Sequence, residues 1–232
     1  MPLKRWIRSA NFAIEGILHA AKTQRHVRYH FYSAAVVLIL SYLLGITRTE
    51  LVIVGLAAIT VLLAELLNTS IETVVDLFSP EHCEEARIAK DVAAGAVLVT
   101  AVGAAIIGYV ILSPPLFRSL REGFHVAKHS GEEISVAAFI LVLILVVILK
   151  AFFGKGTPLR GGLPSGHAAL AFSAWAAISF STGNPQAIIF GFLLASAVAA
   201  SRVTSGVHTI AEVVAGGVMG AAITFLLFRI FS

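Results

Sequence analysis

Charged side chains are scarce in this 232-residue chain. They make up 13% of the residues, against about 25% in soluble domains. Hydrophobic residues reach 58%, above the roughly 45–50% of a soluble protein, and the mean hydropathy is +0.91. This composition excludes a soluble globular enzyme and a disordered chain, and a polytopic membrane protein remains.

Cysteine is nearly absent as well. The single residue, Cys83, cannot form a disulfide within the chain, which excludes a disulfide-stapled scaffold. No cleavable signal peptide is visible in the first 30 residues, which carry basic side chains without a compact apolar core. The net charge of +4 is modest, and with so little soluble surface it indicates membrane orientation rather than nucleic-acid binding.

Long apolar segments predict an all-α integral membrane protein. Residues 3–22 have apolar side chains at helical spacing, which predicts an amphipathic helix on the membrane surface. The polar linker 113–132 is expected to break the helix at its start, Ser113-Pro114-Pro115, and to separate two domains. Seven apolar segments, several near the ~20 residues of a spanning helix, lie at 30–47, 51–78, 91–112, 133–153, 168–182, 186–201 and 209–231.

The distribution of Lys and Arg predicts the orientation. If the N-terminus lies inside and the chain crosses seven times, most basic residues fall on the inner side. The positive-inside rule therefore predicts a cytoplasmic N-terminus.

Acidic residues interrupt the apolar segment 51–78. At 100° per residue, Glu65, Glu72 and Asp76 fall within about 40° of one another on one helix face. Placing carboxylates within a membrane costs free energy, so such residues usually indicate a functional site. Lys90 and Asp91 follow at the start of the next span, and acids with a lysine suit a magnesium-nucleotide site. The alternative is a set of polar contacts that fixes helix packing.

Several long strings carry a resemblance here: residues 13–16 (AIEG), 65–72 (ELLNTSIE), 75–76 (VD) and 89–97 (AKDVAAGAV). Residues 4–112 resemble the small prokaryotic diacylglycerol kinase/undecaprenol kinase family. The resemblance implies a surface helix and three spans in a bacterial inner membrane. It also implies a homotrimer with shared sites and the phosphorylation of a lipid alcohol with ATP and Mg²⁺.

The resemblance also assigns roles. It makes Glu65 the general base on the lipid hydroxyl, supported by Asn68, and makes Glu72 a metal ligand that also contacts the nucleotide. The further residues that it implies in nucleotide binding are Arg5, Lys90 and Asp91. Gln24 departs from the family pattern, in which a glutamate at this position shares the metal with the acid at Glu72. A neutral amide binds Mg²⁺ less well than a carboxylate. Either Glu72 and the substrate phosphates hold the metal without a second carboxylate, or the kinase activity of this half is weakened or lost.

A second group of polar residues lies in the C-terminal half. Pro164-Ser165-Gly166-His167 stands where a polar stretch gives way to an apolar helix, whose free backbone amides suit a phosphate. Arg202 precedes His208 by six residues, and Glu212 follows His208 by one helical turn. An acid at that spacing orients one ring nitrogen and leaves the other as a nucleophile. The alternatives are a capped helix end or headgroup contact for His167 and a simple helix pair for His208 and Glu212.

Together these motifs resemble the type 2 phosphatidic acid phosphatase superfamily, over residues 133–232. The Pro-Ser-Gly-His motif matches fully, and the following Ser-Arg-x5-His-x3-Asp motif matches with Glu212 in place of Asp. The first motif, Lys-x6-Arg-Pro, lacks its arginine because Thr157 stands there, while Lys155 and Arg160 lie close by.

The implied mechanism needs no metal. His208 attacks the phosphorus, Glu212 orients it, and His167 protonates the departing lipid oxygen and then activates water. The residues implied in holding the phosphate are Lys150, Lys155, Arg160, Ser165, Gly166 and Arg202.

The sequence thus predicts a kinase-like domain at 1–112, a linker at 113–132 and a phosphatase-like domain at 133–232, with three and four spans. Both sites are expected at the cytoplasmic face, acting on undecaprenyl or glycerolipid substrates. Two alternatives stay open: a phosphatase whose kinase-like half is only a scaffold, and a channel or lipid transporter that uses the intramembrane acids. The histidines without an acid at ligand spacing are interpreted as interfacial or solvated: His19, His26, His30, His82, His125 and His129.

Overall fold

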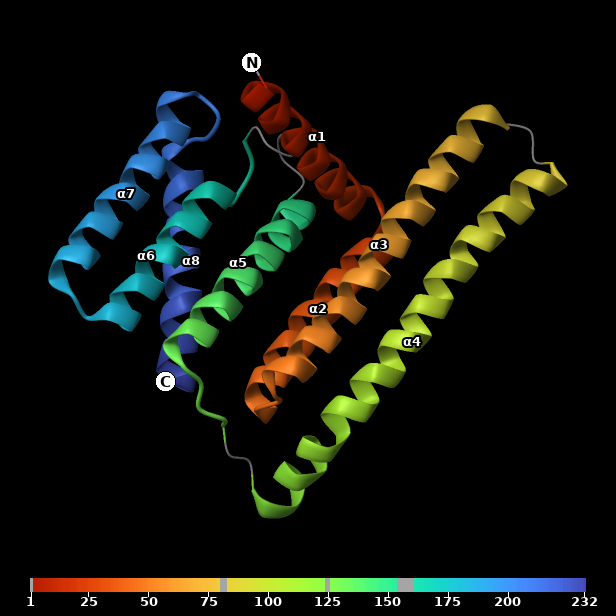
Figure 1. The fold of residues 1–232 in the computed structure, drawn as a ribbon. Helices are drawn as coiled ribbons and strands as arrows, with labels where there is room; N and C mark the ends of the chain where they lie inside the picture. Colours follow the sequence, from red (N-terminus) through yellow and green to blue (C-terminus); the bar gives the residue numbers. More distant parts are fainter. Residues whose placement is uncertain (1, 80–82, 124–125, 154–160) are drawn as a thin grey trace. The chain divides into compact units, whose positions relative to one another are not determined.

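The computed structural model of the chain is built from α-helices. The structure describes residues 2–79, 83–123, 126–153 and 161–232, with the side chains of residues 2–4 and 6–8 left aside. Within these ranges the helices are α1 (Pro2–Thr23), α2 (Arg25–Leu44), α3 (Arg48–Phe78), α4 (Glu84–Glu122), α5 (Gly131–Phe153), α6 (Gly166–Thr182), α7 (Pro185–Thr204) and α8 (Ile210–Phe231) (Figure 1). The predicted all-α fold is confirmed in the described residues.

The chain divides into two compact units. One is Thr23–His125, with helices α2 to α4, and the other joins Met1–Lys22 to Val126–Ser232, with helices α1 and α5 to α8. The helix α1 exists as predicted, and Leu18, Ala20 and Ala21 near its end are buried. The domain boundaries expected from the resemblances stay predictions.

Local signals in the sequence shape the unit of α2 to α4. Gly45 ends α2 in the left-handed conformation, at φ 63°, where a side chain would be strained. Two residues later Thr47 opens α3 with a capping box, in which the Glu50 side chain accepts from the Thr47 backbone. This short turn makes α2 and α3 antiparallel neighbours, and α4 packs against both.

The helix α4 corrects one prediction. It runs for 39 residues through Pro114 and Pro115 to Glu122, so the expected break at Ser113-Pro114-Pro115 is wrong. Proline fixes φ near the helical value, and its cost inside a helix is a lost backbone hydrogen bond and a local bend. Long apolar helices tolerate that cost when neighbouring turns remain hydrogen-bonded.

Backbone contact between α6 and α8 determines the packing of the C-terminal unit. A Cβ added at Gly216 would lie 2.3 Å from the Ser165 carbonyl oxygen, and one at Gly220 would lie 1.9 Å from the Ala169 carbonyl oxygen. Only glycine permits this approach, so the pair acts in close helix packing. Further along, the hydroxyls of Ser173 and Thr224 are buried and hydrogen-bonded at 2.8 Å.

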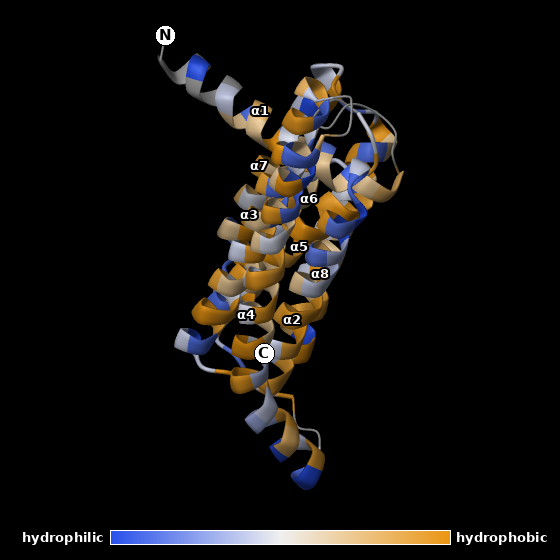
Figure 2. Cartoon of the chain, turned by 90° about the vertical axis from the view of Figure 1, so that its right-hand side faces the viewer, coloured by the Kyte–Doolittle hydropathy of each residue, from blue (hydrophilic) through white to orange (hydrophobic). Residues whose placement is uncertain are grey.

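Most of the helices suit a membrane. Six helices in the described ranges are long and apolar enough to cross one: α2, α3, α4, α5, α7 and α8. The remaining predicted segment, 168–182, corresponds to α6, which has 17 residues. Figure 2 shows hydrophobic residues, in orange, along most of the length of the helices, which suits a lipid environment. The chain is an all-α integral membrane protein.

Candidate functional site

The acids predicted from the sequence lie along one face of α3. Glu65 is 5% exposed and Asn68 is 9% exposed, although both are polar. The Asn68 amide nitrogen donates a hydrogen bond to the Glu72 carboxylate at 2.8 Å. The Asn68 carbonyl oxygen is buried without a hydrogen-bond partner among the described residues. A buried oxygen of this kind is costly unless something binds it, so this turn of α3 is a candidate ligand site.

His30 of α2 joins this site, which the sequence analysis did not predict. Its Nε2 lies 4.0 Å from Oε2 of Glu65. The interpretation of His30 as an interfacial or solvated residue with no acidic partner is therefore wrong. The same interpretation is wrong for His129, whose Nδ1 lies 3.7 Å from Oε2 of Glu133. The sequence held a signal for the contact of His30. In an antiparallel helix pair joined by a short turn, residues at similar sequence distances before and after the turn lie side by side, as His30 and Glu65 do.

One ion pair joins the ends of α3 and α4, and a second lies within the first turns of α4. Lys90 forms an ion pair with Asp76, and Arg87 donates to Asp91 at 2.7 Å. Asp76 and Asp91 are exposed. The structure thus brings Lys90 and Asp91, both predicted nucleotide contacts, to the same end of the α3–α4 pair as Glu72.

The two remaining residues of the kinase-like prediction are less enclosed. Arg5 is exposed on α1, which belongs to the other compact unit. Gln24 is the N-cap residue of α2, and its side chain makes no capping hydrogen bond. Their roles stay predictions.

Oxygen donors for a magnesium ion are present on α3. No group of three or more His, Cys, Asp or Glu side chains suited to a metal occurs among the residues that were described. Mg²⁺ usually takes one or two carboxylates and completes its shell with water and substrate phosphates. The Glu72 carboxylate and the orphaned Asn68 oxygen fit that pattern.

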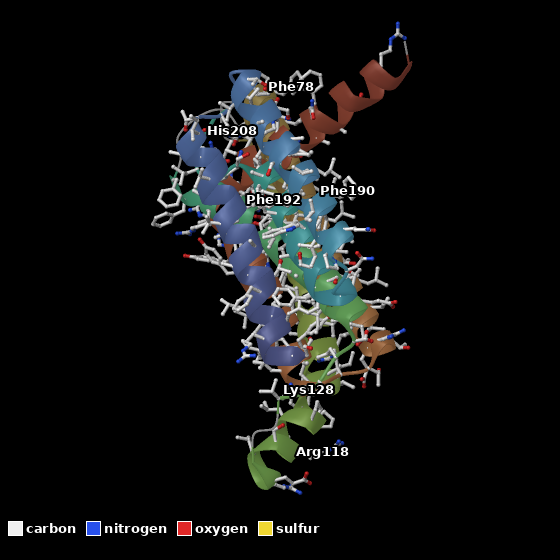
Figure 3. All side chains as sticks on the ribbon, turned by 90° about the vertical axis from the view of Figure 1, so that its left-hand side faces the viewer. Phe78, Arg118, Lys128, Phe190, Phe192 and His208 are labelled. Carbon is white, nitrogen blue, oxygen red and sulfur yellow. The ribbon has the colours of Figure 1, made fainter. Side chains whose placement is uncertain are left out.

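The C-terminal site is centred on His208. This residue lies in the turn just before α8 and is 6% exposed (Figure 3). Its Nδ1 is 2.9 Å from Oε2 of Glu212. Since a carboxylate only accepts hydrogen bonds, this contact assigns the ring hydrogen to Nδ1 and leaves a lone pair on Nε2.

Glu212 holds more than the imidazole. Its Oε2 also accepts from the Thr209 backbone as part of a capping box, and its Oε1 accepts from the Gly162 backbone at 2.9 Å. Gly162 has φ 88°, a conformation that favours glycine. The Ser165 N–H donates to the Glu212 carbonyl oxygen at 3.0 Å. One residue thus fixes the loop before α6, the start of α8 and the imidazole.

Cationic and hydroxyl groups surround this imidazole. Lys150 at the end of α5 is 7% exposed, and its charge and that of Arg202 act on His208. Ser165 is fully buried, and its Oγ and the Nε of Arg202 have no hydrogen-bond partner in the part of the chain that the structure describes. Unsatisfied donors beside buried cations suit an oxyanion.

The structure describes only some of the other residues predicted for this site, which are the catalytic His167 and further phosphate-binding residues. His167 in the first turn of α6 is exposed, and it lies within electrostatic range of Arg202, His208 and Lys150. Gly166 begins the same helix. Lys155 and Arg160 lie outside the described residues.

The pKa of His208 is lowered from its ordinary value. Burial is the largest cause, and the positive charges of Lys150 and Arg202 act in the same direction. The hydrogen bond and charge of Glu212 oppose them. The imidazole is therefore neutral near pH 7, the form that carries a nucleophilic lone pair.

Comparison with known proteins assigns the N-terminal half. The chain is 40% identical over 109 residues to the diacylglycerol kinase of Synechocystis sp., covering 47% of this chain and 62% of that relative. It is 41% identical over 114 residues to the undecaprenol kinase of Bacillus subtilis, covering 49% of this chain and 93% of the relative. The diacylglycerol kinase of Haemophilus influenzae is 30% identical over 97 residues, which are 42% of this chain and 82% of the relative.

No solved structure matches the chain. The family match ends at residue 112, so the resemblance of the C-terminal half to the type 2 phosphatidic acid phosphatase superfamily stays a prediction. The profile described as "Prokaryotic diacylglycerol kinase" matches residues 11–112, over the helices that carry Glu65, Asn68 and Glu72. Together with the coverage of the B. subtilis relative, this match shows that the chain belongs to the prokaryotic diacylglycerol kinase family.

Proposed function

We propose that the protein is a bifunctional lipid enzyme of a bacterial inner membrane. Its N-terminal half phosphorylates a lipid alcohol with ATP, and its C-terminal half hydrolyses a lipid phosphate. The family match, together with the buried Glu65 and Asn68, carries the first activity. The buried His208–Glu212 pair beside Lys150 and Arg202 carries the second.

In the kinase reaction, Glu65 accepts the proton of the lipid hydroxyl as the hydroxyl oxygen bonds to the γ-phosphorus of ATP. The bond from that phosphorus to the β,γ-bridging oxygen breaks, and ADP leaves. Glu72 and Asn68 would hold Mg²⁺, which neutralises phosphate charge when bound. Lys90 and Asp91 are proposed to bind the nucleotide, together with Arg5.

In the phosphatase reaction, Nε2 of His208 attacks the phosphorus while the bond to the lipid oxygen breaks. His167 donates a proton to that oxygen, which leaves as a lipid alcohol. His167 then takes a proton from water, the water oxygen attacks the phosphohistidine, and inorganic phosphate departs. Lys150, Arg202, Ser165 and the Gly166 backbone stabilise the charge on the phosphate oxygens, with Lys155 and Arg160 as further proposed contacts.

An alternative rests on one residue. Gln24 stands where the family pattern has a metal-sharing glutamate, so the kinase-like half would then serve as a scaffold beside an active phosphatase. The homotrimer, the cytoplasmic N-terminus and the cytoplasmic location of both sites are part of the same proposal. The lipids considered are undecaprenol, diacylglycerol and their phosphates.

The test uses the full-length protein, purified and returned to phospholipid vesicles. Phosphate release from undecaprenyl phosphate and phosphatidic acid is measured in EDTA, for the wild type, His208→Ala and the exposed-histidine control His26→Ala. We expect release that persists in EDTA and falls at least ~10³-fold in His208→Ala only. Release that survives His208→Ala would refute the phosphatase.

The kinase is tested on the same vesicles with ATP, Mg²⁺ and either undecaprenol or diacylglycerol. In the His208→Ala variant, which lacks the proposed phosphatase, we expect the lipid phosphate and ADP to form in equal amounts. In the wild type, ADP should exceed the lipid phosphate by the amount that is hydrolysed to inorganic phosphate. If phosphate release is seen but no lipid is phosphorylated, the scaffold alternative replaces the bifunctional one. If neither reaction occurs, the channel or transporter interpretation becomes the better account.

A further inference from the structure

A cavity of about 420 Å³ lies between α2, α3 and α4. Its walls consist mostly of small apolar side chains, among them Ala58 on α3 and Ala101, Ala104 and Gly108 on α4. His30 also lines it and is the strongest polar group on its wall. Tyr109 and Leu112 line it nearer the far end of α4.

The polar end of this cavity meets the proposed catalytic base. Nε2 of His30 is 4.0 Å from Oε2 of Glu65, which is too long for a direct hydrogen bond. One hydroxyl oxygen can lie ~2.8 Å from both atoms at once, because their separation is less than twice that distance. The gap is therefore the right width for a single hydroxyl group.

We propose that His30 binds the hydroxyl of the lipid alcohol together with Glu65, while the apolar tail of that alcohol occupies the α2–α3–α4 cavity. This inference rests on the proposed kinase activity and identifies where its acceptor binds. The Nε2–H of His30 donates to the hydroxyl oxygen, and the hydroxyl hydrogen is donated to Glu65. When the oxygen bonds to the γ-phosphorus, the proton passes to Glu65, and His30 keeps its own.

The shape and chemistry of the cavity favour this occupant. An amphiphile with one polar group needs one polar end and an otherwise apolar chamber. His30 lines the cavity and provides that end, with Glu65 behind it at 4.0 Å. Alanine and glycine walls leave room for a methylene chain without specific side-chain contacts. An apolar helix from a second copy of the chain would leave the His30 imidazole on the cavity wall without a polar partner, which is costly.

The decisive experiment compares three variants of the full-length protein in vesicles. His30→Leu removes the donor, His30→Gln keeps an N–H donor at similar reach, and His26→Leu is the control on the same helix, outside the cavity. We expect His30→Leu to raise KM for undecaprenol or diacylglycerol about tenfold without changing KM for ATP. His30→Gln should recover most of the loss, and His26→Leu should behave as the wild type.

A second pair of variants tests the position of the tail. Ala104→Leu fills part of the cavity, and Ala96→Leu makes the same change at an exposed position on α4 outside it. We expect only Ala104→Leu to raise KM for the long-chain alcohol, and to reduce its labelling by a photoreactive analogue of the same alcohol. An unchanged lipid KM with an altered oligomer mass would instead assign the cavity to a second copy and overturn the placement.

The kinase activity and the role of His30 in binding the lipid hydroxyl can be refuted separately. If the wild type phosphorylates no lipid alcohol, the kinase function itself fails. If the wild type is active and His30→Leu has the lipid KM of the wild type, the kinase stands and the role of His30 is refuted. A loss in His30→Leu that His30→Gln does not restore would also refute the hydrogen-bonding role.

Discussion

The two compact units differ in how completely each encloses its own polar site. In the C-terminal unit, His208, Lys150 and Ser165 are all at least nine-tenths buried. In the unit of α2 to α4, Glu65 and Asn68 are equally buried, but Asp76 and Asp91 lie exposed at the helix ends. The difference agrees with the proposed functions: a covalent nucleophile must be held in one orientation before the substrate arrives, whereas a nucleotide site can be completed by the nucleotide and its metal.

Helix packing shows the same contrast. Glycines bring the backbones of α6 and α8 into contact, so the loop before α6 reaches the start of α8. By comparison, Ala93 is the one residue of α4 buried within the described chain, and Val99 is 72% exposed. Large apolar side chains stay exposed in both units, among them Phe190 of α7 at 71%. The difference between the units therefore lies in the close backbone contact of α6 with α8, and not in the amount of apolar surface.

The largest effect is expected at the base on α3. Glu65→Gln keeps the shape of the side chain and removes its ability to accept a proton, so the kinase rate should fall about 10³-fold. Phosphate release by the C-terminal site should not change. Both rates are measured on the same vesicles, with the exposed Glu85→Gln as the matched control, which should keep both activities. Equal loss of the two activities would mean that the units are not functionally separate.

The contrast in packing predicts a difference in stability between two glycines. In Gly220→Ala the new Cβ meets the Ala169 carbonyl, so we expect unfolding to become easier by about 1–3 kcal/mol. Gly103→Ala on α4 has nothing within 4 Å, and should be neutral or stabilising by up to about 1 kcal/mol. Thermal unfolding in detergent measures both. Equal shifts would contradict the close contact of α6 and α8.

A carboxylate introduced at the start of α2 should change the metal dependence of the kinase-like unit alone. Gln24→Glu adds a negative charge where a metal ligand is expected, so half-maximal kinase activity should need about tenfold less Mg²⁺. Phosphate release in EDTA should stay the same. A magnesium titration of both activities gives the answer, and an unchanged titration would remove Gln24 from the metal site.

The smallest effect concerns pH. In the proposed phosphatase, His208 must be neutral to attack the phosphorus. Burial, with the charges of Lys150 and Arg202, lowers its pKa below the ordinary 6.5 despite Glu212. A lowered pKa keeps the imidazole neutral as the pH falls, so phosphatase activity should be lost with a midpoint below pH 6.5. A pH profile of phosphate release tests this, and a midpoint above 6.5 would show that Glu212 dominates instead.

Sequence patterns predicted the helices and much of the two polar sites, because the relevant residues lie one or two turns apart on a single helix. Glu65 with Asn68, and His208 with Glu212, are of this kind. Contacts across the fold were not predicted: His30 meets Glu65 only through the α2–α3 hairpin, and Gly162 meets Glu212 only through the α6–α8 packing. The continuous helix through Pro114 and Pro115 was not predicted, because proline commonly ends a helix in a soluble protein.

The shared bonds of Glu212 have an evolutionary consequence. This carboxylate caps α8 and anchors Gly162 as well as orienting His208, so losing it would weaken the fold along with the chemistry. Selection for a folded protein would then preserve Glu212 even in a lineage that had abandoned hydrolysis. The side chain of His167, in contrast, takes part in none of these hydrogen bonds. Among descendants of this chain, substitution of His167 would therefore be the earlier sign that the proposed phosphatase activity had been lost.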